Sequence, residues 1–438
     1  MTRPATKIEN QTPDEKEDEP PGKSAIHSEL EEEPPCSGAS GRYRFFEHIS
    51  DRTWNDWKWH FRNRITTVNR LNVYIPLSIE EQTQLRLVAM RYPLSVTPYY
   101  LSLINPDDPD DPIRKQAVPS VLEITMSGIG LEDPLAEKED SVVPGLVHRY
   151  PDRVLMVLTD ICPMLCRHCT RKREWRHGGW VRTDSEIEAM LEYLRRNDNI
   201  RDVIISGGDP LTLSTRHLES IISKVRKIKN IEIIRIGTRF PVVLPQRIDD
   251  ELCAMLSKYS PIWLNTHFNH PREITPEAAE ACDRLLRSGV PVNNQSVLLH
   301  GINDTVGTML KLCQGLLRIK VRPYYLFQCD EVQGTEHLRT PVEAGVKIIE
   351  GMRGYTSGLA VPTFVVDLPQ GGGKVPLQPN YVLSQTENEL VLRNYQNRIF
   401  HYRNPDQRSG VEEAVMVRKL KFKESRGTVD ADRVIVRS

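Results

Sequence analysis

The sequence lacks three features that would each assign it to a familiar class of protein. Its 438 residues contain only 8 cysteines, too few for a disulfide-stabilised scaffold of this length. No apolar run is long enough to span a bilayer, and the N-terminal stretch has no apolar segment of the kind a signal peptide needs. The formal net charge of -1 offers no broadly basic surface. We therefore expect a cytoplasmic protein that binds neither nucleic acid nor a membrane.

Three of the few cysteines lie close together, as Cys162, Cys166 and Cys169. They follow the apolar run 154–158, which predicts a buried strand, so they occupy the loop at its C-terminal end. Three thiolates on one short loop can bind three irons of a [4Fe–4S] cluster and leave the fourth iron without a protein ligand. An iron with open positions can chelate a small molecule.

The same cysteines could serve two simpler roles. A zinc ion could be held with His168 as its fourth ligand, although zinc sites more often use CxxC pairs. The cysteines could also be unrelated core residues, but their neighbours Arg167, His168 and Arg171 are too polar for a core segment. The remaining cysteines are scattered and fit small buried residues or free thiols: Cys36, Cys253, Cys282, Cys313 and Cys329.

Strand and helix patterns alternate through the middle of the chain. Apolar, β-branched runs predict strands at 154–160, 202–206, 231–237, 262–267, 291–299 and 322–328. Amphipathic patterns predict helices near 184–197, 215–229, 246–258, 275–288, 304–318 and 341–353, the first of them capped by Asp184. Six strand–helix units predict an α/β fold with parallel strands and right-handed crossovers. Both an open (β/α)6 barrel and a doubly wound sheet fit this pattern.

The chain divides into four predicted regions. Residues 1–41 are acidic and proline-rich and are expected to be disordered, because they cannot bury enough apolar surface. Residues 42–145 are expected to be mostly helical, and residues 146–360 form the strand–helix core. Residues 361–438 are expected to hold a further strand, a lysine loop, short strands and a mobile charged tail.

Local signals support the first and last of the folded regions. Trp54, Trp57 and Phe61 recur at helical spacing and predict one apolar stripe. Ser78 with Glu81 predicts a capping box that opens a helix to about residue 90. The last region should contain strands at 363–367, 381–383, 389–392 and 398–400.

Polar groups follow the predicted strands, where the reactive groups of parallel α/β folds gather. They are the cysteine loop, Ser206-Gly207-Gly208-Asp209, Arg239, His267, Gln295 within the fifth run, Asp330, Asp367 and Lys374. The sequence therefore predicts that these side chains share one face of the core. Scattered surface residues would not fall into this pattern.

Lys374 and two aspartates suggest the kind of ligand. A lysine that follows glycines is more often part of a surface loop, but a desolvated lysine amine can form a Schiff base with an aldehyde cofactor. Two carboxylates in one pocket, Asp330 and Asp367, raise each other's pKa unless a cation lies between them. They favour a basic amino acid, with lysine first, and disfavour glutamate.

Residues 54–405 resemble the lysine 2,3-aminomutase family of radical S-adenosylmethionine (SAM) enzymes. The resemblance rests on the cysteine loop and on the strings Asn55–Trp57, Thr97–Leu103, His148–Arg153, Thr266–Pro271, Phe364–Asp367 and Gly371–Lys374. It favours the partial TIM-type barrel of the radical SAM core over the doubly wound sheet. It also implies three cofactors: a [4Fe–4S] cluster, SAM and pyridoxal phosphate (PLP).

The resemblance implies a role for each candidate residue. Cys162, Cys166 and Cys169 would bind the cluster, and Lys374 would hold PLP, with Arg149, Tyr150 and Arg153 around its ring and phosphate. SAM would be bound by Ser206, Gly207, Gly208, Asp209, Arg239, His267 and Gln295. Arg171 would bind the carboxylate of the substrate, and Asp330 and Asp367 would bind the side chain of the substrate.

The implied reaction converts L-lysine to β-lysine. A 5′-deoxyadenosyl radical would take a hydrogen atom from C3, and the amino group would migrate from C2. Arginine 2,3-aminomutase and glutamate 2,3-aminomutase are the alternatives within the family, and a non-catalytic iron–sulfur or zinc module is the alternative outside it. The implied partners are an electron donor such as flavodoxin or ferredoxin and further copies of the chain in a homo-oligomer.

Two positions depart from the family pattern. Some members bind a structural zinc through cysteines, but Thr305 stands at one such position and no cysteine follows Cys329, so we expect no structural zinc. Gln370 stands where the first of four glycines is expected before Lys374. That change should tighten the loop without removing the lysine.

Overall fold

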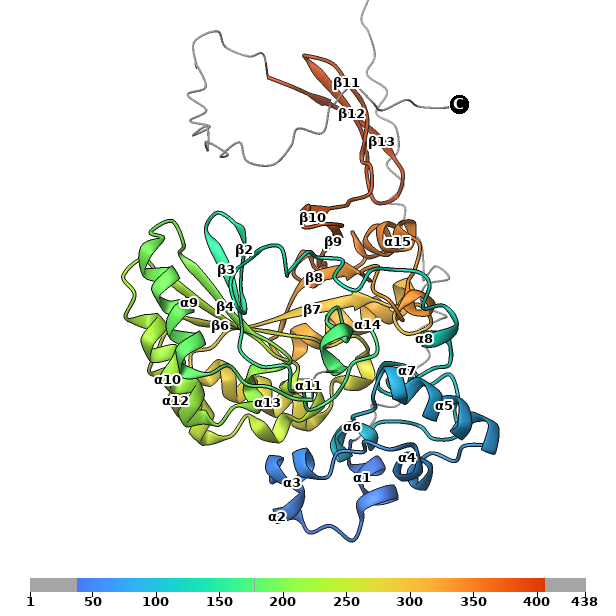
Figure 1. Ribbon diagram of the computed structural model, residues 1–438. Helices are drawn as coiled ribbons and strands as arrows, with labels where there is room; N and C mark the ends of the chain where they lie inside the picture. Colours follow the sequence, from blue (N-terminus) through green and yellow to red (C-terminus); the bar gives the residue numbers. More distant parts are fainter. Residues whose placement is uncertain (1–37, 177, 406–438) are drawn as a thin grey trace, which may run out of the picture. The chain divides into compact units, whose positions relative to one another are not determined.

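The computed structural model describes residues 38–176 and 178–405 (Figure 1). The chain forms two compact units that divide after Pro379. The predicted disorder of the N-terminal tail and the mobility of the charged C-terminal tail therefore fall largely outside the described residues. Within them, helix α1 begins at Gly38, inside the stretch predicted to be disordered.

The first unit is built on a ten-stranded sheet in which the spatial order of the strands follows their order in the sequence. The strands are β1 (Ser141–Val143), β2 (Leu146–Tyr150), β3 (Arg153–Val157), β4 (Asp202–Ser206), β5 (Ile233–Gly237), β6 (Ile262–Thr266), β7 (Val292–Leu298), β8 (Arg322–Gln328), β9 (Thr363–Leu368) and β10 (Gly373–Pro376). From β3 to β9 all neighbours are parallel, while β1, β2 and β10 pair in antiparallel fashion.

This strand order decides between the two architectures that the sequence left open. A doubly wound sheet reverses its strand order at a switch point. Here the order from β3 to β9 never reverses, and the sheet ends at β1 and β10. The chain therefore winds in one direction, as in a barrel that stays open, and the predicted partial barrel is confirmed.

The crossover helices of the barrel are α9 (Asp184–Arg196), α10 (Thr215–Arg226), α11 (Phe240–Val243), α12 (Asp250–Ser257), α13 (Pro276–Arg287), α14 (Val306–Arg318) and α15 (Val342–Met352). Short 3-10 turns lie before, between and after them, at Lys172–Arg176, Pro210–Thr212, Pro245–Arg247, Pro271–Glu273, Glu336–Leu338 and Gly358–Ala360. Helix α9 begins with a capping box of Thr183 and Glu186, so the predicted cap at Asp184 is wrong by one residue. Its apolar face buries Ile187 and Leu191 against the sheet.

The N-terminal region is helical, as predicted: α1 (Gly38–Phe46), α2 (Asp51–Trp54), α3 (Trp57–Arg62), α4 (Val68–Tyr74), α5 (Ile79–Arg91), α6 (Pro98–Leu101), α7 (Pro112–Ala117) and α8 (Leu122–Thr125). The capping box of Ser78 and Glu81 opens α5, which confirms that prediction. The prediction of one continuous helical stripe through Trp54 and Trp57 is wrong, because α2 ends at Trp54 and a new helix, α3, begins at Trp57 with Asp56 as its cap.

Three strands of the sheet were not predicted. β1 and β2 extend it before β3, and β10 extends it after β9. As a result, Lys374 lies in β10, opposite Asp367 of β9, and not in a free loop. The turn before it holds Gln370 at φ +55°, a left-handed conformation that a glycine would adopt without strain.

The second unit contains β11 (Val382–Gln385), β12 (Glu389–Arg393) and β13 (Ile399–Arg403). They form a three-stranded antiparallel sheet, close to the three short strands predicted there. Among the described helices of either unit, none is both long and apolar enough to cross a membrane.

Candidate active site

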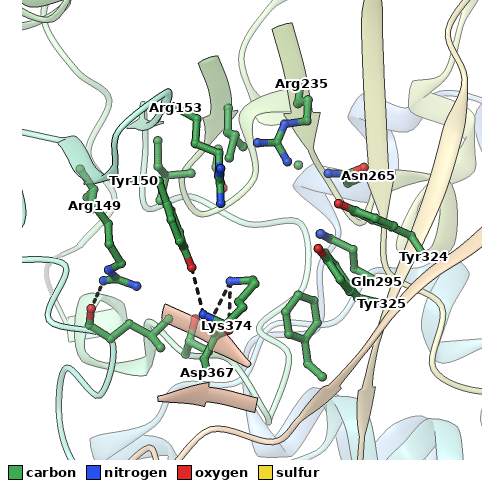
Figure 2. Close-up of a pocket in the computed structure, with 18 of the residues that line it drawn as sticks. Arg149, Tyr150, Arg153, Arg235, Asn265, Gln295, Tyr324, Tyr325, Asp367 and Lys374 are labelled. Carbon is green, nitrogen blue, oxygen red and sulfur yellow. Dashed lines mark hydrogen bonds and ion pairs between the residues drawn. The ribbon is translucent and has the colours of Figure 1, made fainter. Parts of the chain in front are cut away.

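A cavity of about 730 Å³ lies on the inner face of the open barrel (Figure 2). Its walls come from alternate residues of the strands, as the period-two geometry of a strand requires. β4, for example, contributes Asp202, Ile204 and Ser206, and β6 contributes Trp263 and Asn265. Several predicted site residues line this cavity: Arg149, Tyr150, Arg153, Arg171, Ser206, His267, Gln295, Asp330, Asp367 and Lys374.

The cysteine loop leaves the end of β3 beside this cavity. Thr170 and Arg171, the two residues after Cys169, line the cavity wall, whereas the three cysteines are not among its lining residues. Burial raises the pKa of Cys162 well above its ordinary value, and the neighbouring Cys169 raises it further. Thiols packed this closely do not ionise together unless a positive centre stabilises the thiolates, so the loop fits an iron–sulfur cluster.

Two glycines allow the loop after β4 to pack directly on the cysteine loop. A Cβ atom at Gly207 would lie 2.4 Å from the carbonyl oxygen of Thr159, and one at Gly208 would lie 2.5 Å from that of Asp160. Gly207 also has φ +148°, a conformation that L side chains rarely adopt. Any side chain at either position would push the two loops apart.

Asp209 is turned away from the cavity. Its carboxylate accepts hydrogen bonds from the Thr238 hydroxyl at 2.7 Å and from the backbone N–H of Arg239 at 2.8 Å. Burial raises the pKa of Asp209 to about 7, although these hydrogen bonds oppose the rise. The side chain therefore fixes the end of β5 and the start of the Arg239 segment.

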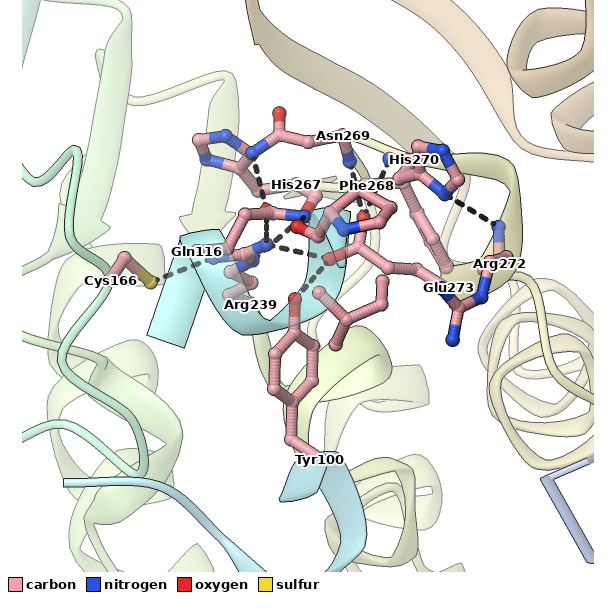
Figure 3. A network of polar contacts seen from close by, with 12 residues as sticks. Tyr100, Gln116, Cys166, Arg239, His267, Phe268, Asn269, His270, Arg272 and Glu273 are labelled. Carbon is pink, nitrogen blue, oxygen red and sulfur yellow. Dashed lines mark hydrogen bonds and ion pairs between the residues drawn. The ribbon is translucent and has the colours of Figure 1, made fainter. Parts of the chain in front are cut away.

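Arg239 is the centre of a buried polar network (Figure 3). Its Nη1 donates to the sulfur of Cys166 at 2.9 Å, and its Nη2 donates to Gln116 at 2.6 Å and to Glu273 at 2.8 Å. Glu273, fully buried, also accepts from the hydroxyl of Tyr100 at 2.6 Å. Helices α6 and α7 thus hold a guanidinium group against one cysteine of the loop.

Two histidine rings lie between this network and the cavity. The rings of His168 and His267 are 5.1 Å apart, and His267 lines the cavity. Burial, with a contribution from the Arg239 charge, lowers the pKa of His267 to about 3. The Nε2 atom of His267 is buried and has no hydrogen-bond partner among the described residues.

The opposite wall carries Lys374. Its amino group lies 2.9 Å from Oδ1 of Asp367 and 5.2 Å from the centre of the Phe327 ring. Its backbone N–H donates to the hydroxyl of Tyr150 at 3.1 Å. Burial and the charge of Asp367 raise the pKa of Asp330 to about 7. The charge of Asp367 therefore opposes the ionisation of Asp330, in the direction that the sequence predicted for this residue.

The two arginines expected near PLP lie on the antiparallel pair β2 and β3, with Arg149 in β2 and Arg153 in β3. The guanidinium of Arg153 stacks on the ring of Tyr150 at 3.8 Å and pairs with Asp152 at 2.8 Å. The Nε of Arg149 donates to Asp140 at 2.9 Å. An arginine stacked on an aromatic ring keeps its edge free for hydrogen bonds, so this wall fits a ring that carries a phosphate.

Arg171 already has an anionic partner that the sequence did not indicate. Its guanidinium contacts both carboxylate oxygens of Glu137, at 2.6 Å for Nη2 and 2.9 Å for Nε, and donates to the carbonyl of Gly207 at 2.9 Å. Burial alone would raise the pKa of Glu137, but Arg171 and Arg173 lower it to about 2. Glu137 belongs to a stretch of charged residues that looks like solvated surface.

Other cavity residues were also missed, among them Arg235, which pairs with Asp202 at 2.8 Å, and Asn265. They occupy inward positions of predicted strands where an apolar side chain would be usual. A polar residue in such a position was the signal that could have identified them.

Comparison with known proteins agrees with this geometry. Residues 156–313 match the Radical SAM superfamily, and residues 349–431 match the Lysine-2,3-aminomutase family. The L-lysine 2,3-aminomutase of Clostridium subterminale is 54% identical over 83% of this chain and 88% of its own length. That of Bacillus subtilis is 50% identical over 82% of this chain and 77% of its own.

The chain belongs to the lysine 2,3-aminomutase family.

It is an isomerase of the radical SAM superfamily, and this membership implies a [4Fe–4S] cluster and SAM as cofactors. A more distant member is the glutamate 2,3-aminomutase of Clostridioides difficile, 42% identical over 85% of this chain and 86% of its own. A solved radical SAM methyltransferase from Sphaerobacter thermophilus aligns with 51% of this chain and 68% of its own, at 16% identity and a TM-score of 0.38.

Proposed function

We propose that this member of the family is a PLP-dependent L-lysine 2,3-aminomutase. The observation that carries the proposal is the wall formed by Asp330, Asp367 and Lys374, which shares its cavity with Arg171 of the cysteine loop. PLP, when bound, supplies an aldehyde for the amino group and an electron sink, while the cluster with SAM supplies a radical. The residues of the chain bind, orient and exclude solvent.

Lys374 is proposed to anchor PLP. Asp367 holds its amino group at 2.9 Å, and this amino group would hold the aldehyde of PLP. Tyr150 and Arg153 would lie along the ring, and Arg149 with Arg153 would bind the phosphate through their N–H groups.

Asp330 and Asp367 are proposed to bind the side-chain ammonium of lysine. Burial, with a further contribution from the charge of Asp367, raises the pKa of Asp330. A cationic side chain placed between them removes that penalty and gains charge-assisted hydrogen bonds, whereas the carboxylate of glutamate would add a third negative charge. A guanidinium would also satisfy the two carboxylates, so arginine is the second candidate substrate.

The cluster side of the cavity would hold SAM. Arg239 uses four of its five N–H groups on Cys166, Gln116, Glu273 and the carbonyl of His267, which leaves one on Nη1 for the carboxylate of SAM. We place Ser206, Gly207, Gly208, His267 and Gln295 around the rest of SAM, with Asp209 supporting Arg239 from behind. Arg171, held by Glu137, is oriented for the substrate carboxylate.

The test is anaerobic reconstitution with iron, sulfide and PLP, followed by incubation with SAM, a reductant and one amino acid at a time. We expect β-lysine from lysine, no product from glutamate, and loss of product in the Lys374→Ala and Cys169→Ala variants. Turnover of glutamate in preference to lysine would contradict the role of the two aspartates. A protein that binds no iron–sulfur cluster would contradict the whole proposal.

Three finer proposals accompany this one. Flavodoxin or ferredoxin would supply the electron, the active form would be a homo-oligomer, and the absence of structural zinc stays a prediction. Each has its own measurement: turnover with each purified donor, the mass of the protein in solution, and the metal content after reconstitution.

A further inference from the structure

The cysteine loop carries two cations that point away from the cavity. Arg167 lies between Cys166 and Cys169, and Lys172 lies three residues after Cys169. The side chains of both are 1% exposed. This overturns the expectation that Arg167 is too polar for a core position, because the structure buries it with a partner.

A single carboxylate serves both cations. Glu123 of α8, fully buried, lies 2.5 Å from Nη2 of Arg167 and 2.8 Å from Nζ of Lys172. The other contacts of the two cations are with neutral groups. Arg167 donates to the backbone carbonyls of Tyr92 and Pro93, and Lys172 donates to those of Arg167 and Gly334.

Burial lowers the pKa of Lys172 to about 8, so below that pH the three side chains leave one positive charge buried behind the cysteine loop. His337, which lies near them, does not change this count, because burial lowers its pKa to about 4 and keeps the ring neutral. A buried charge without a counter-charge is costly. The structure must meet it with an anion, and Cys169 is near enough to interact electrostatically with Lys172.

An iron–sulfur cluster on the three cysteines would be that anion. A 2+ cube bound by three thiolates has a net charge of -1, which becomes -2 when one electron is added. A fixed positive charge beside the cluster stabilises the reduced form more than the oxidised form, because the reduced form carries more negative charge. Burial makes this effect insensitive to salt.

We propose that Glu123, Arg167 and Lys172 set the reduction potential of the cluster by holding one net positive charge behind the cysteine loop. This inference rests on the proposed function, since it needs the cluster. None of the three touches the cavity, so they tune and position the cluster and are not catalytic residues. The proposal also gives the N-terminal helical region a role, because it supplies the carboxylate.

Charge counting gives a sharp test. The buried set carries +1 in the natural protein, 0 in Lys172→Met, +2 in Glu123→Gln, and again +1 in the double variant. The probe is the potential of the reconstituted cluster, measured by a redox titration followed by electron paramagnetic resonance. We expect Lys172→Met to shift the potential to more negative values, Glu123→Gln to shift it to less negative values, and the double variant to return toward the natural protein.

The controls separate an electrostatic from a merely structural role. Lys138→Met removes an exposed cation that follows Glu137 and should leave the potential unchanged. Loss of a structural support would shift both single variants in the same direction, and the double variant further, which would overturn the inference. Should Glu123→Gln not fold, the comparison of Lys172→Met with the double variant still decides, because only charge predicts recovery.

Failure of this inference is distinguishable from failure of the proposed function. A natural protein that binds no cluster overturns both. A loaded cluster whose potentials ignore the charge order overturns only the inference.

Discussion

Replacing Asp330 by asparagine removes a carboxylate that is costly to ionise in the folded protein. The pKa of Asp330 is raised to about 7 by burial and by Asp367, from an ordinary value of 3.8. A shift of this size, at 1.36 kcal/mol per unit, corresponds to about 4 kcal/mol. The folded protein in its cofactor-free state bears this cost whenever the side chain is ionised.

The sign of the pH dependence follows from the raised pKa. In the unfolded chain Asp330 loses its proton near pH 4, while in the folded protein it keeps the proton until about pH 7. The contribution of this group to the free energy of unfolding therefore falls as pH rises from about 4 to 7 and is constant above. Asp330→Asn has no such group, so its stability relative to the natural protein should increase by about 4 kcal/mol over that window.

Urea denaturation of the cofactor-free protein at about pH 3, 5.5 and 8 measures this difference, because these values extend roughly one unit beyond each end of the window. The exposed Asp198→Asn is the matched control and should show no comparable trend. A stability difference that is the same at every pH would refute the reasoning. In the reconstituted enzyme the same variant should raise KM for lysine roughly 10- to 100-fold, the loss of one charge-assisted hydrogen bond of about 1.5–3 kcal/mol.

Three further substitutions test separate parts of the account. Glu137→Gln leaves Arg171 without its anion and should raise KM for the amino acid while leaving SAM binding unchanged. In the natural protein the Glu137 carboxylate stabilises the fold above about pH 4.5, and this contribution to the free energy of unfolding is lost as pH falls toward 2. Gly208→Ala should abolish cluster incorporation, measured as iron content, because its Cβ would collide with the cysteine loop at 2.5 Å. Ser78→Ala should lower the free energy of unfolding by about 1 kcal/mol through loss of a helix cap and leave activity unchanged.

The parts of the fold that the sequence predicted are those fixed by local chemistry. The parallel strands β3–β6 are rich in apolar and β-branched residues, and helices such as α5 begin with a hydrogen-bonded cap, so both can be recognised in a short window. Strand β2 contains His148 and Arg149, and β10 contains a glycine and a proline; each forms because a neighbouring strand offers its hydrogen-bonding edge. No local pattern predicts such strands.

The residues of the candidate site also divide into those that a local pattern predicts and those that only tertiary packing brings together. The spacing of the cysteines and the position of Lys374 after glycines are local features, and Arg171 of the cysteine loop lines the same cavity as Lys374. The partners of Arg239 could not be predicted, because Gln116 and Tyr100 are more than a hundred residues away in the chain and reach it only through tertiary packing. Glu137 and Glu123 were missed for the same reason.

The central claim is that the cluster and PLP act across one cavity, and the most direct test is an anaerobic crystal structure of the reconstituted protein with SAM and lysine bound. Anomalous scattering would locate the iron, and continuous density from Lys374 or from the bound lysine would locate the PLP ring. The account predicts iron on the sulfurs of Cys162, Cys166 and Cys169, with SAM lying between it and PLP in the cavity that Arg171 lines. Iron bound elsewhere, or PLP on a surface lysine outside this cavity, would contradict it.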